Sequence, residues 1–308
     1  MTLRSPSRRA FLAGVISLAV AGCAVRKPPH RRVRIATGSP TAVYYAIGSA
    51  FARVIEQDLP GADASVLVTA ASAENVQLVS AGRAEVGFSQ ADVLVSGGVP
   101  APSMAALARV YDDLLHLVVR ATGPIHALED LRGRRVSVGA QGSGTVVTVQ
   151  RLFAVAGLAG VDQQKLNLDD SVAALLADDI DGFFFSGGLP VTGIKELTGR
   201  ASVRIVDLSK WASGLRKAYS DVYVVRDVPV SAYGTTAVAT IAVPNLLVVA
   251  SSMDDDLAFD LTRLLMERRD VLAAAHPAAE RLDSRSAIST LPVPLHPGAA
   301  RYYRSIKP

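Results

Sequence analysis

The sequence predicts an α/β fold of two similar lobes, in which strands alternate with helices and pair mostly in parallel. Three observations lead to this prediction. Half of the 308 residues are hydrophobic and 19% are charged, a composition that suits large buried cores. Short apolar strands are followed by a polar loop and then by apolar residues at helical spacing. Two such units, with loops at 37–39 and 142–145, lie about a hundred residues apart and indicate two related lobes.

The elements of the first lobe follow in order. A strand over 33–36 leads through a polar turn to a helix whose apolar residues, from 45 to 55, are spaced by three and four. A second strand covers 65–69, after which Ser72 is the expected N-cap of the next helix. A third strand runs over 85–89 and ends at Gln90. A later strand over 238–243 and helices around 256–268 complete this lobe.

The second lobe begins after the segment 128–133. A strand over 135–139 leads into the loop at 142–145 and a helix that stops near Gly157. Three consecutive phenylalanines form a buried strand that ends at Ser186. The stretch 223–233 carries the chain back. We therefore assign 33–121 with 228–308 to lobe one and 122–227 to lobe two, and the two crossings between them form a hinge.

Small polar residues recur where a strand ends or the next helix begins. In open α/β sheets this edge binds ligands, and the first N–H groups of a helix hold anions without a lysine. The phenylalanine strand adds a possible aromatic wall. The candidate ligand-binding residues are Thr37, Gly38, Ser39, Ser72, Asn75, Gln90, Ser143, Gly144, Thr145, Phe184 and Ser186.

Residues 1–22 have the pattern of an export signal. Arg8-Arg9 followed by Phe11-Leu12 resembles a twin-arginine (Tat) signal, and an apolar run follows it. The ending Val20-Ala21-Gly22-Cys23 resembles a bacterial lipobox, in which the cysteine is lipidated. Cys23 is the only cysteine of the chain. We predict a signal peptide over 1–22 and a lipidated tether over 23–32. The protein is then expected on the periplasmic side of the cell envelope, held to a membrane by this lipid only.

Charge argues against nucleic acid as a partner. The formal charge of +4 includes Arg4, Arg8 and Arg9, which leave with the signal peptide. The remaining chain is close to neutral, whereas a nucleic-acid-binding domain needs a concentrated basic face.

The motifs of catalysis are missing from the sequence. Ser143 lacks the glycine that opens a nucleophile elbow, and no histidine is evidently paired with it. The five histidines do not have metal-ligand spacing. The loop at 142–145 is too short for a dinucleotide fingerprint and has no P-loop lysine. We therefore expect a protein that is not an enzyme, with no catalytic residue, metal or cofactor.

Motifs spread in order over residues 32 to 304 match one known family. They are Thr37-Gly38-Ser39 with Tyr44-Tyr45-x-x-Gly48, Ser72-x-Glu74-Asn75, Gly87-Phe88-x-Gln90-x-Asp92, Gly142-Ser143-Gly144-Thr145, Ile180-Asp181-Gly182-Phe183-Phe184, and Pro294-Leu295-His296-Pro297-Gly298-Ala299 before Tyr302-Tyr303. Through them the chain resembles the TAXI receptors, the solute-binding subunits of one class of TRAP transporters.

The resemblance implies a periplasmic-binding-protein fold, a small carboxylate ligand such as an amino acid or a dicarboxylate, and delivery to a TRAP-type permease in the inner membrane. We expect Tyr44 and Gln90 at the floor of the cleft. Ser72 and Asn75 are expected to donate hydrogen bonds to the ligand from lobe one, and the 143–145 loop to hold its carboxylate from lobe two. One departure is notable: the family's glycine pair ahead of the double tyrosine is replaced by the segment 40–43, whose side chains limit close backbone approach.

Two other functions stay open at this point. A lipid-anchored binding protein could sense a ligand or a protein partner and signal to a membrane protein instead of feeding a transporter. A hydrolase that uses Ser143 would need a general base that the sequence does not reveal.

Overall fold

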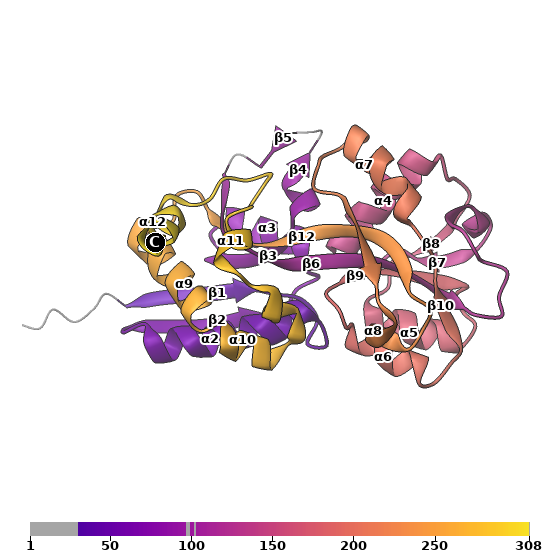
Figure 1. Cartoon of the computed structure of the whole chain (residues 1–308), viewed down its shortest axis with the longest axis horizontal. Helices are drawn as coiled ribbons and strands as arrows, with labels where there is room; N and C mark the ends of the chain where they lie inside the picture. The colour runs from indigo at the N-terminus through magenta and orange to yellow at the C-terminus, as the bar shows by residue number, and fades with distance from the viewer. Residues whose placement is uncertain (1–29, 97–98, 102, 308) are drawn as a thin grey trace, which may run out of the picture.

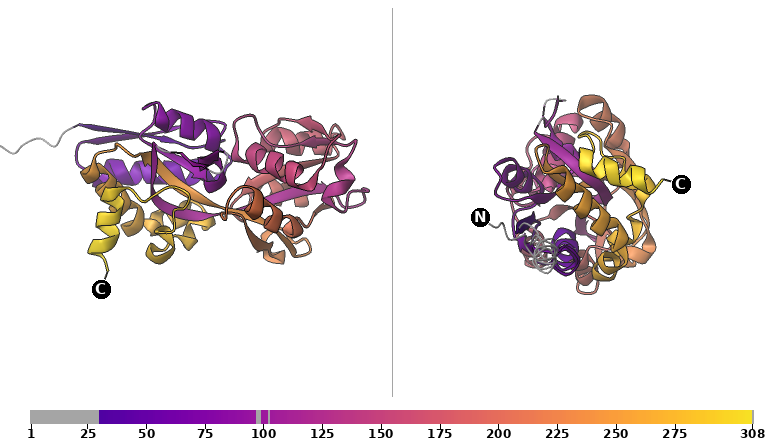
Figure 2. Two further views of the ribbon diagram at one scale, coloured as in Figure 1. Left: turned by 90° about the horizontal axis from the view of Figure 1, so that it is seen from above. Right: turned by 90° about the vertical axis from the view of Figure 1, so that its left-hand side faces the viewer.

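The computed structural model describes residues 30–96, 99–101 and 103–307, which form two lobes side by side along the long axis of the molecule (Figure 1). We keep the names lobe one and lobe two, but residues 228–233, assigned to lobe one from the sequence, pack with the core of lobe two. Figure 2 shows that the first strand and the last helix of the described chain both belong to lobe one.

Lobe one is formed by the two ends of the described chain. Its N-terminal elements are β1 (Arg31–Ala36), α2 (Val43–Asp58), β2 (Ala62–Leu67), α3 (Ser72–Ser80), β3 (Val86–Gln90), the 3-10 helix η1 (Ala91–Leu94), β4 (Val95–Ser96), β5 (Val99–Pro100) and β6 (Met104–Arg120). Its C-terminal elements are β12 (Val238–Ala250), α9 (Asp255–Glu267), α10 (Arg269–Ala275), η4 (Pro277–Arg281), α11 (Ser284–Ala287) and α12 (Pro297–Ser305).

Lobe two is formed by the middle of the chain. Its elements are η2 (Leu128–Leu131), β7 (Arg135–Ser137), α4 (Gly144–Ala156), β8 (Asp162–Gln164), α5 (Leu168–Leu176), β9 (Gly182–Gly187), α6 (Thr192–Thr198), β10 (Val203–Ile205), η3 (Ser209–Trp211), α7 (Ala212–Ala218), β11 (Val224–Val228) and α8 (Val230–Tyr233). α4 ends at Gly157, as predicted, because this glycine adopts the left-handed conformation with φ 58°.

One ten-stranded sheet runs through both lobes, in the order β2-β1-β3-β12-β6-β9-β7-β8, with β10 paired to β6 and β11 to β12. The strands β1, β2 and β3 pair in parallel in lobe one, and β7, β8 and β9 do so in lobe two. The long strands β6 and β12 pair antiparallel to each other and to their neighbours. The predicted α/β class with parallel strand–helix units is therefore confirmed.

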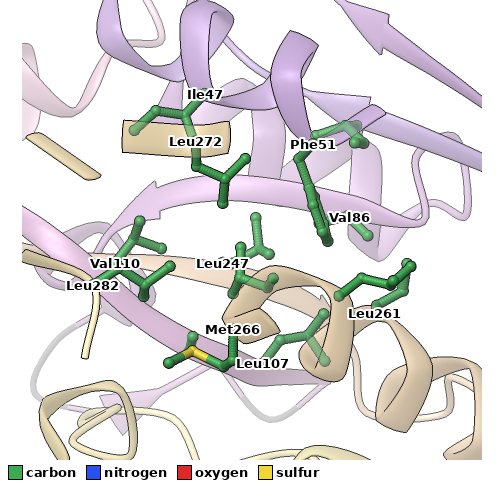
Figure 3. Packing of buried hydrophobic residues seen from close by; sticks show 14 of the residues in the cluster. Ile47, Phe51, Val86, Leu107, Val110, Leu247, Leu261, Met266, Leu272 and Leu282 are labelled. Carbon is green, nitrogen blue, oxygen red and sulfur yellow. The ribbon is translucent and has the colours of Figure 1, made fainter. Parts of the chain in front are cut away.

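The core of lobe one lies between helices and one face of the sheet (Figure 3). Ile47 and Phe51 of α2 pack with Val86 of β3 and Leu247 of β12, and all four side chains are fully buried. Removing a large side chain such as Phe51 from this cluster would cost about 3–5 kcal/mol. The opposite face of the sheet carries a second apolar cluster that includes residues of both lobes, so the lobes share part of their core.

The strands β6 and β12 connect the lobes. Their pairing runs from Leu114 opposite Ala242 to Met104 opposite Ala250. The register shifts twice, between Asn245 and Leu246 and between Leu247 and Val248. The predicted strand over 238–243 is therefore too short, since Pro244 does not end it. Proline is tolerated in a strand at such an irregularity. The first strand also begins earlier than predicted, because residues 31 and 32, assigned to the tether, belong to β1.

Candidate functional site

A cavity of about 110 Å³ lies between the lobes. Most of its wall comes from the loops that follow β1 and β2 in lobe one and β7 and β8 in lobe two, together with the last residues of β3 and β9. These are the carboxyl ends of the parallel strands, the edge at which α/β sheets bind ligands. The cavity is lined by Gly38, Ser39, Thr41, Ala42, Val43, Tyr44, Thr69, Ala70, Ala71, Ser72, Gln90, Tyr111, Asp113, Gly139, Ala140, Ser143, Gly144, Thr145, Leu166, Asn167, Leu168, Phe185, Ser186 and Gly187.

Most of the sequence-predicted site residues line this cavity. They come from six separate segments that the fold brings together. They are Gly38, Ser39, Tyr44, Ser72, Gln90, Ser143, Gly144, Thr145 and Ser186.

Thr37 and Asn75 lie behind the cavity wall, where both are fully buried. Thr37 Oγ1 donates to the carbonyl of Leu67 at 2.7 Å. Asn75 Nδ2 donates to the carbonyls of Thr37 and Phe88 at 2.7 and 2.8 Å. The structure thus corrects their predicted role: these side chains satisfy backbone groups at the ends of β1, β2 and β3, and so hold the loops that form the wall.

Phe184 also differs from the prediction. Its ring packs edge-on against Phe153, with centroids 5.7 Å apart, inside the apolar core. Phe185 lines the cavity instead. Successive side chains of a strand point to opposite faces of the sheet, so the neighbouring phenylalanine is the one that reaches the ligand space.

Ser72 is not the helix cap that its position suggested. The N-cap of α3 is Ala71, whose φ of 84° lies in the left-handed half of the map. Ser72 Oγ instead accepts a hydrogen bond from the backbone N–H of Gln90 at 3.1 Å. The positive φ of Ala71, which is rare outside glycine, costs about 1–3 kcal/mol, and such strain is typical of functional sites.

Sequence reasoning missed Tyr111 and Asp113, which line the cavity from β6. They are two residues apart, so their side chains point to the same face of the sheet. Asn167 and the loop at 69–71 were missed as well. An acidic pair, Asp112-Asp113, inside the apolar run 104–120 is the signal that could have found this part of the site.

A chain of hydrogen bonds crosses the floor of the cavity. Gln90 Nε2 donates to Asp113 Oδ2 at 3.0 Å and to Ser186 Oγ. The Tyr44 hydroxyl lies 3.2 Å from Ser72 Oγ and donates to Asn245 Oδ1. We call Tyr44, Gln90, Asp113 and Asn245 the floor cluster.

Asp113 is the acidic group of the cavity lining. Only 4% of the residue is exposed, and this burial raises the pKa of its carboxyl to about 7, against the pull of the amides of Asn245 and Gln90. Neither Lys, Arg nor His is among the lining residues. Within the described residues, Asp113 Oδ1, Gln90 Oε1 and Asn245 Nδ2 have no hydrogen-bond partner within normal distance and angle.

The opposite wall is the N-terminus of α4. Ser143 caps this helix by accepting from the N–H of Val146 at 3.3 Å. Thr145 Oγ1 accepts from the N–H of Ser186 at 3.1 Å. The first N–H groups of a helix have no intrahelical carbonyl to bond, and with the helix dipole they favour an anion.

The lobes touch around the cavity. The N–H of Ala73 donates to the carbonyl of Gly142 at 3.1 Å, and Thr41 Oγ1 donates to Asp169 Oδ2 at 3.1 Å. A Cβ atom on Gly144 would overlap Gln90 Oε1 and lie 2.9 Å from Ser72 Oγ. Glycine at this position therefore permits the close approach of the lobes.

A second group of polar residues joins the lobes away from the cavity lining. The fully buried Asp92 of η1 accepts at Oδ2 from Thr148 Oγ1 at 2.7 Å and from the Tyr223 hydroxyl at 3.0 Å. Arg151 donates to the carbonyls of Asp92 and Val95 at 2.8 and 2.6 Å. Burial raises the pKa of Asp92, while Thr148 and the charge of Arg151 oppose this rise. We call Asp92, Thr148, Arg151 and Tyr223 the latch cluster.

The predicted signal peptide, Cys23 and most of the tether lie outside the described residues. Among the residues that the structure does describe, no helix has the length and apolar character of a membrane span. The same residues contain no group of three or more His, Cys, Asp or Glu side chains arranged to hold a metal.

Comparisons with known proteins agree with this architecture. A model of the NMT1-like family matches residues 35–306. The periplasmic aliphatic sulphonate binding protein SsuA from Escherichia coli is 14% identical, with a TM-score of 0.51 over 90% of this chain and 84% of that one. A protein from Bordetella bronchiseptica RB50 is 20% identical, with a TM-score of 0.54 over 90% of each chain.

A third structure comes from the system for glutathione import via GshT and the cystine ABC importer TcyBC of Streptococcus mutans. It is 16% identical, with a TM-score of 0.55 over 81% of this chain and 94% of that one. At these identities the likeness shows the fold, which is that of the periplasmic solute-binding proteins. The predicted fold class is confirmed.

Proposed function

The chain belongs to the NMT1-like family, and from this premise we propose that it is an extracytoplasmic solute-binding receptor. It closes on a small ligand that carries a carboxylate and delivers this ligand to a membrane permease. One observation carries the proposal: both lobes contribute polar side chains to a single cavity at the carboxyl ends of their parallel strands. A ligand bound in this cavity contacts both lobes at once and so holds them together.

The N-terminus of α4 supports a carboxylate as the group bound by lobe two. Ser143, Gly144 and Thr145 line the cavity there, and their backbone N–H groups begin the helix. A hydrogen bond to a charged group contributes about 1.5–3 kcal/mol. The similar structures whose names mention aliphatic sulphonate or cystine concern small solutes with acidic groups, in agreement with this assignment.

The segment 40–43 restricts the size of the ligand. Thr41, Ala42 and Val43 line the cavity, where the TAXI receptors that the sequence resembles carry a glycine pair. Their side chains take up ligand space, so we propose a small solute. The assignment of a TRAP-type permease as the partner rests on the sequence motifs shared with that family. Lipidation at Cys23 would hold the receptor beside this permease.

Thermal melting of the purified protein tests the receptor function. The panel contains amino acids, dicarboxylates, sulphonates and aromatic acids. A ligand at 100 times its dissociation constant adds about 2.7 kcal/mol of stability, which raises the melting temperature by a few degrees in a protein of this size. We expect a saturable shift with one class of small acid. The absence of a shift across the panel would overturn the proposal.

Gly144→Ala tests closure. Alanine is at least as good a helix residue, so lobe two keeps its fold, but the added methyl group meets Gln90 and Ser72. We expect at least tenfold weaker binding and a larger radius of gyration in small-angle scattering. Gly199→Ala, at the end of α6, is the matched control and leaves both quantities unchanged. A Gly144→Ala protein that binds with wild-type affinity would contradict a mechanism in which the lobes close.

A further inference from the structure

We infer that the floor of the cavity binds a protonated amine, with Asp113 as its counter-ion, so that the ligand is zwitterionic. This inference rests on the proposed receptor function and narrows its ligand class from small carboxylates to amino compounds.

The first support is the set of hydrogen-bonding groups left open at the floor. Gln90 Nε2 is bonded to Asp113 Oδ2 and Ser186 Oγ, which fixes the side-chain amide so that Oε1 is its free acceptor. Asp113 Oδ1 and Gln90 Oε1 have no hydrogen-bond partner among the described residues, and both residues line the cavity. The buried Asn245 Nδ2 beside Asp113 is also without one and can serve one lone pair of the carboxylate. Because each of these oxygens accepts up to two hydrogen bonds, Gln90 Oε1 and the rest of Asp113 still suit a ligand with two or more N–H donors.

The second support is the missing positive charge. Burial of an ionised carboxylate is costly unless a cation accompanies it. The two arginines beside this part of β6 are occupied by the neighbouring Asp112, with Arg109 at 2.5 Å and Arg226 at 3.5 Å from its carboxylate oxygens. Since the lining contains no basic residue, the ligand is the remaining source of the cation.

The third support is aromatic. Tyr44, Tyr111 and Phe185 line the same cavity as Asp113. Tyr44 and Tyr111 lie close together, with ring centroids 6.4 Å apart. The negative faces of aromatic rings attract an ammonium group and contribute about 0.5–2 kcal/mol when the contact is desolvated.

The position of Gln90 sets the distance between the two charges of the ligand. Its side chain contacts Asp113 through Nε2 and faces Gly144 at the N-terminus of α4 through Oε1. The amine that Asp113 and Gln90 Oε1 accept therefore lies next to the N-terminus of α4, which holds the carboxylate. This arrangement suits an α-amino acid, whose two charged groups are attached to the same carbon.

A competing arrangement has a neutral Asp113 whose O–H donates a hydrogen bond to a second ligand carboxylate. It would leave Gln90 Oε1 without a donor, so the structure favours the amine. The two arrangements predict opposite ligand preferences. They also differ in pH dependence, because the amine requires the ionised form of Asp113 and the second carboxylate requires the protonated form.

The experiment is calorimetric titration at pH 8 with matched probes: alanine and propionate, leucine and 4-methylpentanoate, glutamate and glutarate. We expect saturable binding of an amino acid and at least a hundredfold weaker binding of its partner without the amine. Asp113→Asn keeps the shape but removes the charge, and should weaken amino-acid binding at least a hundredfold. Asp63→Asn, an exposed aspartate of β2 outside the cavity lining, is the control and should change the affinity less than threefold.

The pH series adds an independent readout. Amino-acid binding should be about tenfold weaker at pH 6 than at pH 8, since Asp113 has a pKa of about 7 and must lose its proton. The groups that face it are Tyr44 from α2, Tyr111 and Asp112 from β6, and Asp92 from η1, with uncharged Gln90, Asn245 and Ser186 from the other strands. The two tyrosines, whose pKa values burial raises, stay neutral over this range.

The outcomes separate the two proposals. Equal binding of acids without the amine, or an Asp113→Asn protein with wild-type affinity for the amino acid, would overturn the amine site and leave the receptor function standing. Binding that strengthens as the pH falls would favour the neutral form of Asp113 and overturn it as well. If no amino acid binds, this inference fails, and the melting panel then decides the receptor function separately. Circular dichroism verifies that each variant is folded.

Discussion

The floor cluster and the latch cluster each contain a buried aspartate, but they differ in what surrounds it. Asp92 in the latch cluster has two hydroxyl donors and the guanidinium of Arg151 nearby. Asp113 in the floor cluster has only neutral amides. Each carboxylate keeps Oδ1 without a partner within the described residues, yet only Asp113 lines the cavity. A buried acid with a cation from its own chain stabilises the structure, whereas one without it is suited to a charged ligand.

The largest effect that we expect is a dependence of stability on pH that originates from Asp113. Its pKa is raised from 3.8 to about 7 in the folded protein. Between these values the folded chain binds a proton that the unfolded chain does not, so stability falls as the pH rises from about 4 to about 7 and is constant above. The loss is about 4 kcal/mol at 1.36 kcal/mol per pH unit.

Urea unfolding of the wild type and Asp113→Asn at pH 4 and pH 8 measures this effect. Other carboxylates, such as Glu85 with its lowered pKa, contribute the opposite slope in both proteins. The difference between the two proteins therefore isolates Asp113. If the wild type does not lose stability relative to Asp113→Asn over this range, the ionised carboxylate of Asp113 is better stabilised by hydrogen bonds than the floor cluster suggests.

The next effect concerns the latch cluster. Arg151→Met keeps most of the apolar stem but removes hydrogen bonds to the carbonyls of Asp92 and Val95 and to the Tyr223 hydroxyl. It also leaves Asp92 without its nearby cation. We expect a loss of about 3 kcal/mol in the free energy of unfolding, measured in urea at pH 7. Gln150→Met, an exposed position one residue earlier on α4, should cost less than about 0.5 kcal/mol. Equal stabilities would mean that the latch cluster does not hold the lobes together.

The smallest effect on stability comes from removing one tyrosine hydroxyl from each cluster, and it distinguishes the two clusters. Tyr223→Phe removes a donor to Asp92, and Tyr44→Phe removes the hydroxyl that bonds Ser72 and Asn245. Each should cost about 1 kcal/mol of stability. Only Tyr44→Phe should also weaken ligand binding, by severalfold, because Tyr44 lines the cavity. A parallel loss of affinity in both variants, seen by calorimetry, would show that the two clusters act as one.

The position of the candidate site could be predicted because it depends on local order along the chain. Loops after parallel strands meet at one edge of a sheet, and the segments 37–39 and 143–145 are recognisable as such loops. It was harder to predict which phenylalanine of β9 faces the cavity. Three identical phenylalanines give no periodicity, so the choice of Phe184 over Phe185 could not be settled from sequence.

The connection between the lobes could not be predicted in the same way. The 17 residues of β6 are almost all buried, because the strand has neighbours and helices on every side. Their sequence shows neither alternation nor a turn signal, and Asp113 is therefore hidden inside an apolar run. Pro244 likewise suggests the end of a strand, and only the pairing of β12 with both β3 and β6 shows that the strand continues.

The continuity of β6 and β12 has a mechanical consequence. Because the two connections between the lobes are hydrogen-bonded strands of one sheet, and not flexible linkers, the lobes separate only as far as that sheet twists. The stiffness of the hydrogen-bonded pairing between β6 and β12 then sets both how far the lobes open and how strongly they return to the closed position. Substitutions that stiffen or soften this ladder, remote from every ligand contact, would change how fast a bound solute is released.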